Sequence, residues 1–110
     1  MKKFYAPCRR AGSLLFISGH IPATLDGEMG VMTHQVLDAI EALLQREGLS
    51  LRHLVKVEVF LTDMGEYDAM NRAYVSRLEE EFLPARTTVQ VAALPKGARI
   101  EIAAIASADN

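Results

Sequence analysis

The stretch that decides the fold is the run Val55-Lys56-Val57-Glu58-Val59-Phe60-Leu61. Apolar residues at its odd positions alternate with mostly polar residues at its even positions, which is the period of a half-buried β-strand. Thr62 and Asp63 follow at once, and either side chain can cap the start of a helix. The run therefore predicts a strand that leads directly into a helix.

The helix expected after this strand is marked by apolar residues at helical spacing. They are Tyr67, Met70, Tyr74, Leu78 and Phe82, and Pro84 ends the segment. We expect this stripe, both tyrosines included, to pack into the core. Ahead of the strand, the same spacing predicts a helix over about residues 31–47. Gly48 terminates that helix, because glycine adopts the left-handed conformation without steric cost.

Four further strands are expected around these elements. They span about residues 8–10, 14–18, 86–93 and 99–106. The resulting order, β-β-α-β-α-β-β, predicts an α+β fold in which two helices cover one face of a mixed five- to six-stranded sheet. The other face must meet water or another subunit, and a mean hydropathy of +0.11 favours a subunit. We expect a single domain over residues 1–110.

The composition narrows the class of protein. The formal net charge of −2 argues against a nucleic-acid binder, because such proteins cluster Lys and Arg against phosphates. No apolar run approaches the ~20 residues of a membrane span, and no secretory leader is recognisable. The lone Cys8 and the scattered histidines offer neither an internal disulfide nor the spacing of metal ligands. We expect a cytoplasmic protein that uses no metal.

Two charged residues stand out in the last two strands. Glu101 is the lone charge of residues 100–106, and a carboxylate among apolar residues is costly unless it is paired or hydrogen-bonded. Arg86 opens the preceding strand and shares a face with Thr88 and Gln90. The two charges could line one pocket, where Arg86 grips a substrate carboxylate and Glu101 holds a water. Alternatively, they pair with each other or with a neighbouring chain.

Six stretches, in order along nearly the whole chain, match one known family. They are SGHIP at 18–22, VKVEVFLTDM at 55–64, MN at 70–71, PARTTV at 84–89, LPKGA at 94–98 and IEIAAIA at 100–106. In these stretches the sequence resembles the Rid family of reactive-intermediate (enamine/imine) deaminases, also called the YjgF family. The resemblance implies a chorismate-mutase-like fold and a homotrimer whose active clefts lie between subunits. It also implies that 2-imino acids, of the 2-aminoacrylate/2-iminopropanoate and 2-iminobutanoate type, are hydrolysed to 2-oxo acids and ammonia without a cofactor.

The resemblance also implies the roles of the residues in the last two strands. Arg86 matches the arginine that binds the substrate carboxylate. Glu101 matches the glutamate that positions the attacking water. Thr88 sits where a backbone N–H helps to hold the carboxylate.

Other site residues are implied nearer the N-terminus and on the second helix. Tyr5 has the spacing of the family's substrate-contacting tyrosine, and Ser18 and Gly19 fall in the loop whose backbone lines the pocket. Asn71 matches an asparagine of the second helix, and it either lines the substrate or satisfies buried backbone groups. The chain departs from the family in its shortened loops and in His20, which stands where glutamine is common.

Two other functions remain open at the level of sequence. One is a non-catalytic trimer that binds a small carboxylate such as a 2-oxo acid, for which Arg86 would suffice. Glu101 favours the enzyme over this binder, because a ligand sensor has no need to activate water. The other is an RNA-cleaving translation inhibitor, which the net charge of −2 disfavours.

Overall fold

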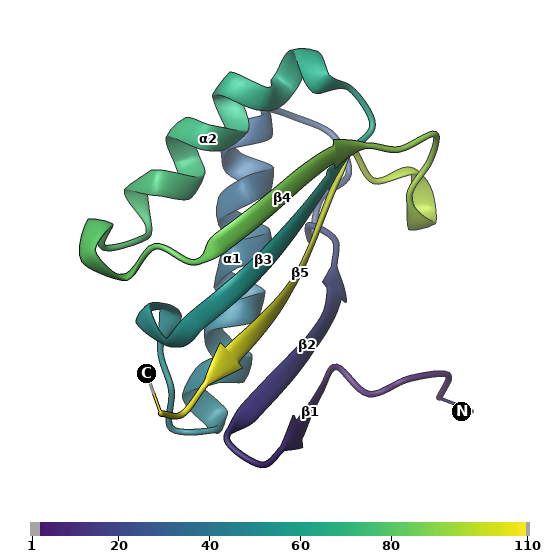
Figure 1. The fold of residues 1–110 in the computed structure, drawn as a ribbon. Coiled ribbons are helices and arrows are strands. Elements are labelled where there is room, and N and C mark those ends of the chain that lie inside the picture. The colour runs from purple at the N-terminus through teal and green to yellow at the C-terminus, as the bar shows by residue number, and fades with distance from the viewer. Residues whose placement is uncertain (1–2, 110) are drawn as a thin grey trace.

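Both helices lie on the same side of a five-stranded sheet (Figure 1). The computed structural model describes residues 3–109. Its strands are β1 (Cys8–Ala11), β2 (Leu14–His20), β3 (Leu54–Leu61), β4 (Ala85–Gln90) and β5 (Ile100–Ser107). Its helices are α1 (Met29–Arg46) and α2 (Tyr67–Ser76). The predicted element order and the two-layer α+β architecture are therefore confirmed.

The strands follow the order β1-β2-β5-β3-β4 across the sheet. β5 inserts between β2 and β3 and pairs antiparallel with both. β3 and β4 pair in parallel, which requires a crossover connection, and α2 provides it. β1 and β4 are the two edge strands, so residues on them lie at opposite edges of the sheet (Figure 1).

The core lies between the sheet and the helices. On β5, every second residue from Ile100 to Ala106 is buried against the helices, and the residues between them are only partly covered. β3 likewise buries Val57, Val59 and Leu61 completely. Phe16 on the opposite face keeps 43% of its surface exposed. The expectation that the helices cover one face alone is confirmed, and the second face is open in the single chain.

The second helix is shorter than its apolar stripe predicts. α2 ends at Ser76, so Leu78 and Phe82 lie beyond it, and a 3-10 turn follows at Glu80–Phe82. The acidic residues of this turn are unfavourable at the negative end of a helix dipole. Arg77, the first residue past the helix, instead forms ion pairs with Asp38 and Glu41 of α1.

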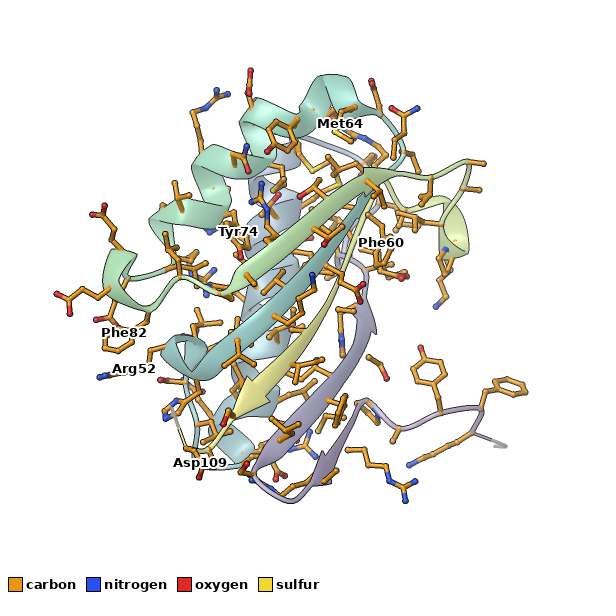
Figure 2. The ribbon with its side chains drawn as sticks, viewed as in Figure 1. Arg52, Phe60, Met64, Tyr74, Phe82 and Asp109 are labelled. Atoms are coloured by element: carbon orange, nitrogen blue, oxygen red, sulfur yellow. The ribbon has the colours of Figure 1, made fainter. Side chains whose placement is uncertain are left out.

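Several local details agree with the sequence patterns, and others do not. Gly48 ends α1 with φ of +77°, as predicted. Phe82 stacks on the guanidinium of Arg52 (Figure 2) rather than packing in the core. β4 ends at Gln90, three residues early, where the Gln90 side chain accepts a hydrogen bond from the backbone of Met64. In the part of the chain described, no helix is both long and apolar enough to cross a membrane.

Two valines of α1 provide a test of this packing. Val36 is fully buried, and Val31 on the same helix is 53% exposed. We expect Val36→Ala to lower the free energy of unfolding by about 2 kcal/mol, because it removes buried carbon and leaves a cavity. Val31→Ala should change it little, since alanine is the better helix former. Chemical denaturation of both variants measures the difference, and equal effects would contradict the assigned helix faces.

Candidate functional site

Arg86 and Glu101 project from opposite faces of the sheet. Arg86 is the cross-strand partner of Val57, which faces the helices. Glu101 is the cross-strand partner of Phe60, which lies on the open face. Because cross-strand partners share a face, the two charges cannot meet within one chain. The prediction that they line one pocket in a single chain, or pair with each other there, is wrong.

Arg86 is surrounded by aromatic side chains of α2. The carbon at the centre of its guanidinium lies 4.8 Å from the ring centre of Tyr74 and 5.7 Å from that of Tyr67. Its Nη2 donates a hydrogen bond to the hydroxyl of Tyr67 over 3.2 Å, and Nη1 lies 4.0 Å from the sulfur of Met70. Among residues 3–109, no carboxylate forms an ion pair with Arg86. Its positive charge is therefore held by ring faces and left free for an anion.

An open pocket of about 470 Å³ lies beside Arg86. Its lining includes Asn71, Tyr74, Val75, Leu83, Pro84 and Arg86. Three polar atoms in this region are buried without a hydrogen-bond partner: Oδ1 of Asn71, the hydroxyl of Tyr74 and Oγ1 of Thr88. Unpaired buried polar atoms are costly, so a cluster of them is unusual in a region with a purely structural role. We call Arg86, Asn71, Tyr74 and Thr88 the Arg86 half-site.

The two tyrosines beside Arg86 differ in acidity. The pKa of the Tyr67 phenol is lowered, first by a hydrogen bond from Asn71 and then by the positive charge of Arg86. Burial raises the pKa of Tyr74, and Arg86 opposes that change only in part. Tyr67 is thus the tyrosine whose ionisation is closer to neutral pH.

Glu101 lies against the backbone of β2, where the strand is irregular. Ile17 pairs with Ala104 and His20 with Ile102, so Ser18 and Gly19 together stand opposite one residue of β5. Such a bulge bends the strand and redirects its side chains. A Cβ on Gly19 would lie 2.5 Å from Oε2 of Glu101, so only glycine leaves room for the carboxylate there.

The N-terminal segment is tied to the same bulge. The hydroxyl of Ser18 donates to the carbonyl of Ala6 over 2.7 Å, and its backbone N–H donates to the carbonyl of Pro7. Tyr5, next to Ala6, is 71% exposed. Glu101, Gly19 and Ser18 form the Glu101 half-site, and Tyr5 precedes it at the β1 edge of the sheet. Tyr5 is therefore far from the Arg86 half-site in the same chain, and its contact with substrate stays a prediction.

Tyr67 and Tyr74 carry a role that the sequence analysis did not assign. Both were expected in the core, and Tyr74 is there at 3% exposure, but Tyr67 is 36% exposed. Positions 67, 71 and 74 follow helical spacing, so these side chains share the face that lies over Arg86. The sequence did contain a signal for this arrangement. An arginine at the start of a half-buried strand needs side chains around its charge, and the tyrosines on this face of α2 could have been assigned to that place.

The close contact at Gly19 gives a specific prediction. In Gly19→Ala, the new methyl group meets the end of the flexible Glu101 side chain rather than backbone, so the carboxylate moves and the fold tolerates the change. We expect little loss of thermal stability and a large loss of any activity that uses Glu101. Gly12→Ala is the comparison variant. Its new Cβ meets nothing within 4 Å, so the change strains only the backbone, whose φ is +60° at this position. Full activity in Gly19→Ala would show that the carboxylate need not occupy this place.

Comparison with known proteins places the chain in a family. A family model described as endoribonuclease L-PSP matches residues 2–108. A RutC family protein of Pyrococcus horikoshii is 41% identical over 108 residues, which cover 93% of this chain and 85% of that protein.

Solved structures agree with this assignment. The crystal structure of RidA from a Psychrobacter species superposes with a TM-score of 0.89 at 34% identity, covering 96% of this chain and 89% of the other. Escherichia coli TdcF with bound serine gives 0.88 at 30% identity, covering 97% and 90%. The matched family model, the identity over most of both chains and the shared fold together show that this chain belongs to the Rid (YjgF/RutC) family.

Proposed function

We propose that this protein hydrolyses 2-imino acids to 2-oxo acids and ammonia, in a site that combines the Arg86 half-site of one chain with the Glu101 half-site of another. The substrates would be of the 2-aminoacrylate/2-iminopropanoate and 2-iminobutanoate type. The observation that carries the proposal is the state of Arg86. It is a cation without an acidic partner in the described chain, held by two tyrosine rings beside an open, largely apolar pocket.

An arginine in this state suits a small carboxylate. The guanidinium offers N–H groups in a planar fork that matches a carboxylate in a bidentate manner. The neighbouring side chains Val75, Leu83 and Pro84 are apolar and suit a short aliphatic substituent. A family relative supports this chemistry, since TdcF has been crystallised with serine, whose carboxylate is of the kind proposed here.

Glu101 supplies the second requirement of the reaction. Its carboxylate lies beside Gly19, and none of the hydrogen bonds or ion pairs among residues 3–109 involves it. A free carboxylate can accept a proton from water and orient its oxygen toward the substrate. On the open face, such a water would lie outside the single chain. The proposal therefore requires a second copy to cover this face.

The side chains of Arg86 and Glu101 are sufficient for the two steps of the proposed hydrolysis. Water adds to C2 of the protonated imine while Glu101 accepts one of its protons, and the C=N electron pair moves to the nitrogen, which gives a neutral carbinolamine. The nitrogen then takes that proton from Glu101 and leaves as ammonia, while the hydroxyl loses its proton to solvent as the C=O bond of the 2-oxo acid forms. Arg86 holds the carboxylate next to C2 throughout, so that the reacting carbon and the water meet in one geometry.

The activity is tested with imines generated in place. An amino-acid oxidase produces the 2-imino acid, and semicarbazide competes as a trap, so hydrolysis appears as a fall in semicarbazone formation. We expect acceleration by the wild-type protein and at least about a hundredfold loss in Glu101→Ala, since general-base help contributes on that order. Arg86→Lys should mainly raise KM, because lysine keeps the charge and loses the bidentate fork. Wild-type activity in Glu101→Ala would exclude the role of that carboxylate.

The shared site is tested by mixing inactive chains. If each site takes Arg86 from one chain and Glu101 from its neighbour, co-expressed Arg86→Ala and Glu101→Ala chains assemble some intact sites. Random assembly in a closed ring with head-to-tail interfaces restores about one quarter of the wild-type sites. Each variant alone should be inactive, and a mixture of Arg86→Ala with the Arg86→Ala/Glu101→Ala double variant should stay so. No recovery in the first mixture would exclude a site shared in this way.

The same experiments separate the other candidate functions. Carboxylate binding that depends on Arg86, with no hydrolysis of any imine tested, would identify a non-catalytic binding protein. The family model's description, endoribonuclease L-PSP, names RNA as a further substrate to test. RNA cleavage that survives Arg86→Ala and Glu101→Ala would belong to another surface of the protein.

A further inference from the structure

The position of Arg86 depends on the hydroxyl of Tyr67. This hydroxyl accepts the hydrogen bond from Nη2 over 3.2 Å. Tyr67 stands at the start of α2 and is 36% exposed, so it binds the guanidinium from the solvent-exposed side of the helix. Tyr74, two turns further along, packs beneath the guanidinium with its ring 4.8 Å away.

Two further acceptors line the pocket beside the guanidinium. The hydroxyl of Tyr74 is buried, which raises its pKa, and Arg86 opposes that rise through its charge and by hydrogen bonding, although no hydrogen bond of good geometry joins the two groups. Oδ1 of Asn71, which lines the same pocket, is likewise buried and unpaired. Both atoms can accept an N–H, and a guanidinium carries five. If hydrogen bonding alone decided the position of Arg86, its guanidinium would turn inward, because it would then gain hydrogen-bond partners.

We propose that Tyr67 is a positioning residue, whose hydroxyl holds Arg86 outward and keeps the guanidinium available to a substrate carboxylate. In this arrangement, two acceptors inside the protein stay unpaired so that the cation remains accessible. Binding strength is thus gained at a cost in stability, as at many functional sites. The inference rests on the proposed function in one respect, that Arg86 is the site of carboxylate binding.

The phenol also makes the site sensitive to alkaline pH. Once Tyr67 ionises, its phenolate forms a direct ion pair with Arg86 and competes with the substrate carboxylate. The groups that face this phenol are Asn71 and then Arg86, which lower its pKa, and Asp68, which raises it. Tyr74 faces the same guanidinium, but burial raises its pKa. Carboxylate affinity should therefore fall as pH rises toward the range in which tyrosine ionises, and it should begin to fall below the ordinary value of about 10.

The test measures binding of 2-oxobutanoate, a carboxylate probe, by titration calorimetry to the assembled protein. Tyr67→Phe keeps the ring against Arg86 and removes only the hydroxyl. We expect its Kd to rise about three- to tenfold, as for the loss of one hydrogen bond to a positioned group. We also expect its Tm to stay equal or to rise, because Arg86 can then turn toward Tyr74 and Asn71. The alkaline fall in affinity should disappear in this variant.

Two further variants make the result interpretable. Ser76→Ala removes another hydroxyl from α2, one that donates to the carbonyl of Ala73 and is remote from Arg86 in the described contacts, and it should bind the probe like wild type. Arg86→Lys should weaken binding strongly. If Arg86→Lys binds normally, the proposed carboxylate site itself fails. If Arg86→Lys is weak but Tyr67→Phe binds like wild type, or loses affinity together with a lowered Tm, the positioning role of Tyr67 is wrong and the proposed function stands.

Discussion

Successive side chains of a β-strand point to opposite faces, and two helices can cover only one face of a five-stranded sheet. This constraint shapes the rest of the molecule. The covered face carries fully buried residues such as Val57, Val59 and Ile102, which pack against α1 and α2. The open face carries Phe16, Glu101 and Ile105, which are only partly covered in the single chain. A carboxylate and apolar side chains are thus left together on a surface that has no helix.

The same constraint divides the candidate site. Arg86 lies under α2 on the covered face, and Glu101 lies beside Gly19 on the open face. Each charge lacks an opposite charge within the described chain, and under the proposed function each meets a partner from outside it. Assembly with another copy is the simplest arrangement that serves both, because one chain's open face can then be placed beside another's α2. On this view, the sheet that stabilises the chain also keeps the two half-sites apart, so a complete site cannot form within one chain.

Much of the fold was predictable because it follows from local patterns. The alternation in β3, the apolar stripe of α1 and the stop at Gly48 depend on near neighbours in sequence. The stripe and the stop are observed, and so is the alternation from Val57 to Leu61, but Val55 is 36% exposed where the register of β3 shifts between Leu54 and Lys56. The end of α2 was not predictable from the stripe. Directly past that end, Arg77 forms ion pairs with Asp38 and Glu41, which lie far away in sequence, and the stripe does not encode such contacts. Tyr67 was misplaced for a similar reason, because its exposure depends on Arg86 from β4.

The residue types of the candidate site could be recognised from the sequence, because motifs such as PARTTV and IEIAAIA carry their chemistry in a short run of residues. Their arrangement could not. Whether Arg86 and Glu101 share a face depends on the register in which β3 pairs with β4 and with β5, and the bulge at Ser18 and Gly19 sets where the carboxylate rests. Register and bulges arise from contacts between distant segments, since a shift of one residue moves every side chain to the other face.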